Sequence, residues 1–396
     1  MHKQRVVVHL AEWNSVLKKM HLAVNALPLM AVHTGIARYL TNLCSHMKAT
    51  GRVDVTYVSP GKCSSKPPSG ARQGGTLDSL LRFPSRFLYW TRTVHWLAYE
   101  AYARYVAEHR HVDIFHESFY TPARIGTGAM QVFTLHDLSL IRYPETHSLD
   151  RRLFFERFFE PRLNEADAII VPSLFVKQEL CDYAGMAGSR AVVIPEGVDT
   201  CFGPRPQGVI REVLEKYGLP SEYGLFVGTL EPRKNLSTLL NALARSKAAL
   251  PLVIVGWSGW GDPVFRRELN RLGLQDRVYF PGYLSDEELA CVYCGADVFF
   301  YPSLYEGFGL PVLEAMACGT PVVCSDVASI PEVAGDAAVR VSPHDSAQWA
   351  DAMDRILHEN DMRERLAAAG MKQAAQFTWE NAASQTLELY AVLQNS

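Results

Sequence analysis

The strongest constraint on the fold is the stretch 306–323, which reads Glu-Gly-Phe-Gly-Leu-Pro-Val-Leu-Glu-Ala-Met-Ala-Cys-Gly-Thr-Pro-Val-Val. Gly307 and Gly309 allow backbone N–H groups to approach an anion closely, and Pro311 suits the first turn of a helix. Because the N-terminus of a helix attracts negative charge, this order of residues predicts a turn and a helix that bind a phosphate group.

The same stretch carries two acidic residues, Glu306 before the glycine turn and Glu314 inside the predicted helix. Along a helix they are too far apart for their carboxyl groups to share one proton. We therefore expect each glutamate to hydrogen-bond a different part of one ligand. Glu314 stands among apolar residues, where an unpaired acid is costly, and this favours a ligand role over that of a surface helix acid.

Apolar runs of strand length alternate with helical segments, which predicts an α/β fold with mostly parallel sheets. The elements expected in the first half are a strand within 21–28, a helix from about 36 to 48, and strands at 53–58, 114–116, 131–135, 168–171 and 191–194. In the second half we expect strands at 224–227, 251–255, 277–280, 298–301 and 321–324 and a last helix at 379–393.

The chain has 396 residues, of which 48% are hydrophobic, and this is enough for two cores. We expect an N-terminal extension at 1–19, a first domain at 20–202, a linker rich in turn formers at 203–208, and a second domain at 209–376. A net charge of −3 gives no sign of polyanion binding and argues against a nucleic-acid partner.

The eight cysteines are scattered and no secretory signal peptide is recognisable, so we expect the reducing cytoplasm. Cys291 and Cys294 have C-x-x-C spacing, but no second such pair or clustered histidine accompanies them. We interpret them as core thiols rather than a zinc or redox site.

Two blocks of the second half resemble the signature of the retaining, nucleotide-sugar-dependent glycosyltransferases of family 4. They are 226–235, which reads Phe-Val-Gly-Thr-Leu-Glu-Pro-Arg-Lys-Asn, and 301–323. The resemblance implies the GT-B fold, an α/β architecture in which two Rossmann-like domains face each other across a donor-binding cleft. It also implies that the segment 377–396 is a helix that crosses back to the first domain.

Arg233 and Lys234 follow a predicted strand, at the edge where open α/β sheets bind ligands. Cleavage of a sugar from a nucleoside diphosphate leaves negative charge on the diphosphate, which fixed positive groups stabilise. A solvated basic pair is the alternative, but cations are unfavourable at the start of a helix. The chain has no Asp-x-Asp triplet, where metal-dependent glycosyltransferases of the other major fold hold a divalent ion. We therefore expect no metal and no cofactor.

The resemblance also implies roles for individual residues. Glu306 is expected to bind hydroxyls of the donor sugar, Glu314 the ribose, and the N–H groups of 308–310 the sugar and phosphate. His136 ends a predicted strand where family members place a histidine beside the reacting sugar; a capping or core histidine is the alternative. The expected catalytic residues are Glu306, His136, Arg233 and Lys234, and the expected donor-binding residues are Gly35, Gly228, Arg233, Lys234, Glu306, Gly307, Phe308, Gly309, Leu310 and Glu314. The residues expected to line the cleft are Asp137, Ser173, Glu196, Gly256, Trp260 and Tyr283.

The segment 80–110 mixes arginines with aromatic residues. Such a face can rest on anionic lipid headgroups. Trp96, Tyr99 and Ala103 nevertheless recur at helical spacing and fit a protein core equally well. Membrane contact would suit an acceptor carried on a polyprenyl diphosphate, at the inner face of the cytoplasmic membrane.

The function that the sequence favours is transfer of a hexose from a nucleotide sugar, with retention of configuration, to a saccharide or lipid-linked saccharide acceptor in surface polysaccharide synthesis. Mannose from GDP-mannose is the favoured donor, because the segments 136–138, 142–145 and 259–260 resemble bacterial surface-polysaccharide mannosyltransferases. A UDP-sugar-dependent transferase, a GT-B nucleotide-sugar epimerase and a noncatalytic nucleotide-sugar-binding protein are the alternatives.

Overall fold

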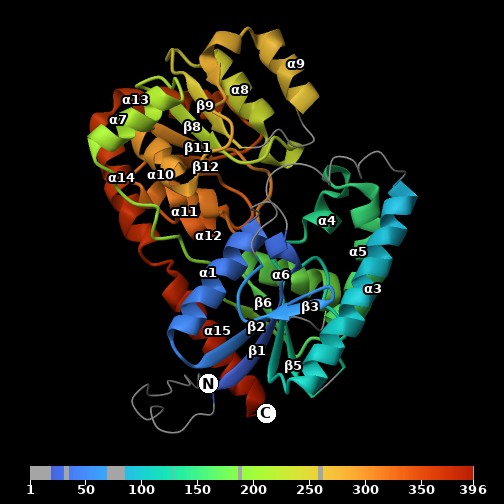
Figure 1. The fold of residues 1–396 in the computed structure, drawn as a ribbon. Coiled ribbons are helices and arrows are strands. Elements are labelled where there is room, and N and C mark those ends of the chain that lie inside the picture. The colour runs from blue at the N-terminus through green and yellow to red at the C-terminus, as the bar shows by residue number, and fades with distance from the viewer. Residues whose placement is uncertain are drawn as a thin grey trace, which may run out of the picture.

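A computed structural model shows two α/β domains, one above the other in Figure 1, each built on a parallel sheet with helices on both faces. The structure describes residues 19–30, 35–68, 85–126, 128–185, 190–256 and 262–395. Apolar cores cover both faces of each sheet, because helices pack apolar faces on both sides of strands that read as continuous apolar runs.

The first sheet has seven strands in the order β3-β2-β1-β4-β5-β6-β7. They are β1 (Met20–Asn25), β2 (Val53–Ser59), β3 (Lys62–Ser64), β4 (Ile114–Glu117), β5 (Met130–Thr134), β6 (Ala168–Val171) and β7 (Ala191–Val193). All neighbours pair in parallel except β3, a short return strand that the sequence did not predict. The first predicted strand is confirmed only as far as Asn25, whose side chain accepts a hydrogen bond from the backbone N–H of Leu27 at 2.9 Å and turns the chain.

Helices cover both faces of this sheet. They are α1 (Gly35–Ala49) and, from the end of the chain, α15 (Trp379–Gln394) on one face, and α3 (Ser85–His109), α5 (Leu149–Leu163) and α6 (Leu174–Ala184) on the other, with the short α4 (Ser139–Arg142) above. In Figure 1 the red α15 lies beside the blue α1, in the lower domain. Gly197 allows the chain to reach α15, since a Cβ there would lie 2.2 Å from the backbone nitrogen of Trp379.

The second sheet has six parallel strands in the order β10-β9-β8-β11-β12-β13. They are β8 (Gly224–Val227), β9 (Leu252–Val255), β10 (Val278–Tyr279), β11 (Val298–Tyr301), β12 (Val322–Ser325) and β13 (Val339–Val341). Its helices are α7 (Gln207–Lys216), α8 (Leu236–Arg245), α9 (Asp262–Leu272), α10 (Asp286–Gly295), α11 (Leu310–Ala317), α12 (Ile330–Ala334), α13 (Ser346–His358) and α14 (Asn360–Ala374). All five predicted strands are present, β13 was not predicted, and α7 begins inside the segment predicted as the linker 203–208.

Helix α3 carries the described part of the aromatic segment 80–110; residues 80–84 lie outside the described ranges. Trp96, Tyr99 and Ala103 are buried against the first sheet, so the core interpretation is correct for these residues. Trp90, on another side of the same helix, is 64% exposed. No helix in the described part of the chain is long and apolar enough to cross a membrane.

The C-x-x-C pair lies on α10, and both of its cysteines are free thiols. Cys291 is buried, and Cys294 is half-buried with its Sγ 3.3 Å from the carbonyl oxygen of Gly203. These positions agree with the interpretation of the pair as packed thiols.

Candidate active site

A cleft of about 540 Å³ opens between the two domains, at the carboxyl ends of strands from both sheets. This is the edge at which open α/β sheets bind ligands. The residues predicted from the sequence that line it are Gly35, His136, Asp137, Glu196, Gly228, Arg233, Lys234, Glu306, Gly307, Phe308, Gly309, Leu310 and Glu314. The cleft therefore gathers most of the predicted site from segments far apart in the chain.

Glu306 forms the centre of a buried ion cluster in the second domain. Its Oε1 accepts a hydrogen bond from Lys234 Nζ at 2.7 Å, and its Oε2 lies 3.3 Å from Arg233 Nη1. Burial disfavours the charged carboxylate, but the two cations outweigh it and hold the pKa of Glu306 at about 2. Glu306 is therefore an anion at neutral pH, able to accept hydrogen bonds from hydroxyl groups.

The two cations are held rigidly and lie largely out of solvent. Arg233 and Lys234 belong to a single 3-10 turn, Pro232–Lys234, that follows β8, and Lys234 is only 9% exposed. Arg233 also bonds to Glu231 Oε1 at 2.7 Å and to the carbonyl oxygen of Tyr305 at 2.8 Å. The alternative of a solvated basic pair is therefore wrong. Glu231, which fixes one side of the guanidinium, was not singled out from the sequence.

The glycine turn before α11 is fixed by a hydroxyl. Ser329 Oγ lies 2.9 Å from the carbonyl oxygen of Glu306 and 2.8 Å from that of Phe308. Gly309 caps α11 with a φ of 116°, a conformation that residues with side chains rarely adopt. The predicted turn and helix are confirmed, and the turn brings the start of α11 to the cleft.

Glu314 is 4% exposed, so it is not a surface acid. Its Oε2 accepts a hydrogen bond from Tyr293 at 2.9 Å, and its Oε1 is bonded by Arg38, which reaches across from α1 in the first domain. Arg38 also pairs with Asp286. Burial raises the pKa of Glu314, although the charge of Arg38 opposes the shift. Arg38 and Tyr293 were not singled out from the sequence.

His136 faces this cluster from the end of β5. Its Nδ1 lies 3.1 Å from Glu196 Oε1, and its ring meets Tyr39 edge-on at 4.8 Å. Its Nε2 is buried without a hydrogen-bond partner among the residues that the structure describes. His136 thus presents a positioned imidazole with one nitrogen still able to bond a ligand.

The two domains touch directly beside the site. A Cβ at Gly307 would lie 1.9 Å from the carbonyl oxygen of His136, so only glycine allows this approach. Ser173 Oγ donates to the Gly307 carbonyl at 2.8 Å, and the Tyr305 hydroxyl lies 2.9 Å from the backbone nitrogen of Leu138. These contacts fix the glycine turn against the histidine strand.

Three of the residues predicted to line the cleft do not line it. Ser173 lies behind Gly307 and supports it rather than facing the cavity. Gly256 packs behind Gly228, where a Cβ would be 2.0 Å from the Gly228 carbonyl oxygen. Tyr283 is 63% exposed and lies outside the cleft, because it precedes α10 in a surface loop. Trp260 lies outside the described residues.

The first domain contributes a cleft wall that the sequence did not reveal. It is formed by Phe119, Tyr120, Ser139, Leu140, His147, Arg151 and Phe155. These residues come from the loop after β4, from the start of α4, and from the first two turns of α5 with the segment before it. They stand in no recognisable motif, and only the fold brings them together.

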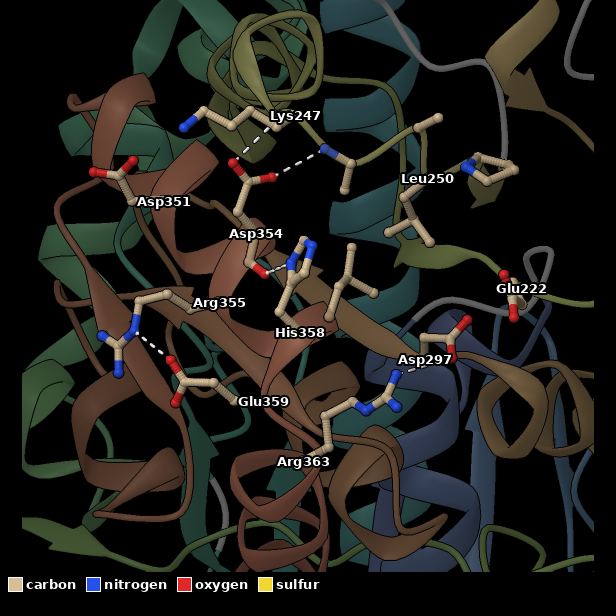
Figure 2. A pocket seen from close by; sticks show the side chains of 14 residues that line it. Glu222, Lys247, Leu250, Asp297, Asp351, Asp354, Arg355, His358, Glu359 and Arg363 are labelled. Atoms are coloured by element: carbon tan, nitrogen blue, oxygen red, sulfur yellow. Dashed lines mark hydrogen bonds and ion pairs between the residues drawn. The ribbon is translucent and has the colours of Figure 1, made fainter.

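A second cavity, of about 950 Å³, lies at the amino ends of the second domain's strands (Figure 2). Figure 2 shows Asp354 bonded to the segment that precedes β9, Arg355 to Glu359, and Arg363 to Asp297. Its charged groups largely satisfy one another, and it lies at the wrong end of the sheet for a typical α/β ligand site. We therefore assign the chemistry to the interdomain cleft.

Family models match both halves of the chain. The model for glycosyl transferases group 1 matches residues 211–373, and the model for glycosyltransferase family 4 matches residues 33–202. The chain is 33% identical to an O-antigen chain mannosyltransferase B of Escherichia coli, over 92% of this chain and 98% of that protein. It is 32% identical to a serotype-specific mannosyltransferase WbdA of the same species, over 67% of this chain but only 34% of that protein.

Solved structures show the same architecture. A sucrose-phosphate synthase from Thermosynechococcus elongatus superposes with a TM-score of 0.75 at 26% identity, covering 94% of this chain and 99% of the other. WaaG, a glycosyltransferase involved in lipopolysaccharide biosynthesis, superposes with a TM-score of 0.69 at 16% identity and supports the fold alone. The fold is GT-B, and the chain is a glycosyltransferase that belongs to glycosyltransferase family 4.

Proposed function

We propose that this glycosyltransferase moves mannose from GDP-mannose to a saccharide acceptor in surface polysaccharide synthesis. The buried cluster of Arg233, Lys234 and Glu306 opposite His136 carries the proposal, since it provides fixed charges for a diphosphate and a hydrogen-bond acceptor for a sugar. The choice of mannose is supported by relatives named as mannosyltransferases, one of which aligns along nearly its whole length.

In the proposed reaction, the bond between the anomeric carbon and the leaving phosphate oxygen breaks as the acceptor oxygen bonds to the same face of that carbon. The acceptor hydroxyl proton passes to the departing phosphate, so configuration is retained without a side-chain nucleophile. Arg233 and Lys234 stabilise the growing negative charge, and no metal is needed. Glu306 and the free nitrogen of His136 bond hydroxyls of the donor sugar, while Glu314 bonds those of the ribose.

The ribose must displace Arg38 from Glu314. Because Arg38 also pairs with Asp286, it keeps one carboxylate partner when the nucleotide arrives. Two hydroxyl groups of the ribose then donate to Glu314 in place of the Arg38 guanidinium. Their hydrogen bonds offset part of the free energy lost when Arg38 leaves Glu314.

A test begins with thermal unfolding in the presence of GDP, UDP and their sugars, with excess EDTA throughout. We expect GDP and GDP-mannose to stabilise the protein most, because a ligand at a hundred times its dissociation constant adds about 2.7 kcal/mol to the unfolding free energy. Transfer in EDTA to a mannoside acceptor, followed by NMR of the product anomer, then tests metal independence and retention.

The same assay separates the alternatives. Preferential stabilisation by UDP would assign the donor to the uridine class. Release of an altered free sugar from donor alone would indicate an epimerase, and binding without any turnover would indicate a noncatalytic protein. Loss of transfer in EDTA that Mg²⁺ or Mn²⁺ restores would contradict the metal-free mechanism.

We also propose that the enzyme acts at the inner face of the cytoplasmic membrane, on an acceptor carried by a polyprenyl diphosphate. Helix α3 supports this, because Trp90, Val94 and Leu97 form an exposed apolar stripe at helical spacing. Arg104, seven residues after Leu97 and therefore on the same side of α3, is also exposed. An amphipathic helix of this kind can lie in the headgroup region.

A variant with Trp90→Ser and Val94→Ser is expected to lose most of its binding to phosphatidylglycerol-containing vesicles, since two large apolar side chains leave the interface. Cosedimentation measures the bound fraction. Val392→Ser, which removes an equally exposed apolar side chain from α15, is the control and should bind as wild type. Equal binding by all three proteins would exclude α3 as the contact.

A further inference from the structure

The cleft wall contributed by the first domain contains a cation, Arg151, for which the described residues provide no carboxylate partner. Among the residues that the structure describes, Arg151 has no ion pair, whereas Arg38, Arg233 and Lys234 each bond a carboxylate. Arg151 lies in the first turn of α5 and lines the cleft. A charged group that faces a substrate cleft without a counter-ion is a candidate for binding an opposite charge.

Within the described part of the chain, Arg151 is held by an aromatic ring and its guanidinium donates no hydrogen bond. Its guanidinium carbon lies 5.6 Å from the centre of the Tyr120 ring, in a cation–π contact. Such a contact orients the planar group but leaves its N–H donors available. A guanidinium held in this way is suited to bidentate binding of a phosphate or carboxylate.

The acid nearest in sequence, Asp150, forms its ion pair with another cation. Asp150 is buried and bonded by Arg92 of α3, at 3.1 Å from Nε and 2.7 Å from Nη2. This pair fixes the first turn of α5 against α3. The Asp150 carboxylate therefore faces Arg92, and the next residue, Arg151, lines the cleft.

His147 lines the same cleft as Arg151 and senses its charge. Its Nε2 lies 3.0 Å from Ser139 Oγ. Burial lowers its pKa; the charge of Asp137 opposes this, while those of Arg233 and Arg151 lower it further. His147 therefore lies among the charges of the leaving-group cluster and Arg151, and it is a neutral hydrogen-bonding group at neutral pH.

We propose that Arg151, oriented by Tyr120 and flanked by His147, binds a phosphate group carried by the acceptor saccharide. This inference rests on the proposed transferase function and names the acceptor class. The leaving diphosphate has its own cations, Arg233 and Lys234, in the second domain. A second cationic position in the opposite wall therefore serves the other substrate.

The test uses full-length enzyme saturated with the nucleoside diphosphate that stabilises it, so that the donor site is filled. Calorimetry then compares mannose 1-phosphate with methyl α-mannoside. We expect wild-type enzyme to bind the phosphorylated sugar about ten- to a hundredfold more tightly, the range of one charged hydrogen-bonded pair. Arg151→Ala should bind both sugars alike, with its nucleotide affinity unchanged.

Two further variants are controls for the binding measurement. Arg151→Lys keeps a cation and should retain part of the preference for the phosphorylated sugar. Arg157→Ala removes an exposed arginine from the same helix, outside the cleft, and should behave as wild type.

The source of the phosphate is distinguished by transfer assays. Acceptors are mannose linked through a diphosphate to a polyprenyl chain, mannose 1-phosphate, and methyl α-mannoside. Dependence on Arg151 for both phosphorylated acceptors identifies the phosphate itself as the recognised group, and dependence for the lipid-linked acceptor alone assigns recognition to the lipid-borne diphosphate.

The inference is overturned if Arg151→Ala keeps the wild-type preference for mannose 1-phosphate, or if wild-type enzyme binds the two soluble sugars alike and its transfer to the lipid-linked acceptor does not depend on Arg151. It is also overturned if Arg151→Ala weakens nucleotide binding as much as sugar phosphate binding, since Arg151 would then serve the donor. Failure of any nucleoside diphosphate to stabilise the protein would instead contradict the proposed function, on which the inference depends.

Discussion

Replacing Lys234 with alanine is expected to lower kcat by about a hundredfold or more. Negative charge on the leaving diphosphate grows toward the transition state, and loss of one preorganised donor typically costs that much. Lys234 Nζ lies 2.7 Å from Glu306 Oε1, so the change also removes the main counter-ion that keeps Glu306 ionised. Arg233→Ala should have a similar effect. Steady-state kinetics with GDP-mannose and a mannoside acceptor measures both.

Folding must be separated from catalysis here, because Glu306 is buried and Lys234→Ala leaves it with Arg233 at 3.3 Å as its remaining cation. Circular dichroism and thermal unfolding of each variant make that separation. Arg245→Ala removes an exposed arginine from α8 and is the charge-matched control. Near-wild-type turnover of a folded Lys234→Ala or Arg233→Ala protein would refute their role at the diphosphate.

The two glutamates of α11 and its preceding turn should respond differently to replacement by glutamine. Glu306→Gln is expected to depress kcat while leaving GDP affinity unchanged or slightly higher, since Arg233 and Lys234 lose a competing anion. Glu314→Gln is expected to weaken GDP itself by about 1–2 kcal/mol, roughly five- to thirtyfold, because an amide accepts a weaker hydrogen bond from the ribose than a carboxylate does.

Calorimetric titration of GDP into both variants distinguishes these roles. Asp286→Asn is the matched control, because it removes the other partner of Arg38 without changing Glu314. If the effect of Glu314→Gln operated through a released Arg38, Asp286→Asn would reproduce it. Equal losses of GDP affinity in the two glutamate variants would contradict separate roles for the two residues. A loss of GDP affinity confined to Glu306→Gln would reverse the assignment.

The strands and the glycine turn were predictable because their causes are local. Short apolar runs bounded by turn formers specify β-strands of an α/β sheet, and Gly309 followed by Pro311 specifies a helix start. The short strand β3 was missed because it has only three residues and gains its hydrogen bonds from β2 alone.

The missed residues of the site have partners that no local pattern could indicate. Arg38 meets Glu314 across 276 positions of sequence, and Tyr120, from the loop after β4, meets Arg151 of α5. The pairing of Arg38 with Glu314 follows from how the two domains face each other, and that of Tyr120 with Arg151 from the packing of the first domain. Gly256 and Tyr283 were wrongly predicted to line the cleft. Both follow strand ends in the sequence, but the fold does not bring them to the cleft.

The close approach of Gly307 to the backbone of His136 affects how domains of related glycosyltransferases can be joined into chimeras. The second domain carries the cations for the leaving group, so exchanging it with that of a relative is an obvious route to a new donor. The exchange would also replace the surface that meets the first domain, where Glu332 accepts hydrogen bonds from the backbone N–H groups of Leu174 and Phe175 at 2.8 and 2.7 Å. A chimera therefore needs Gly307, Tyr305 and Glu332 in the incoming half, or its two halves will fold separately and fail to enclose a substrate.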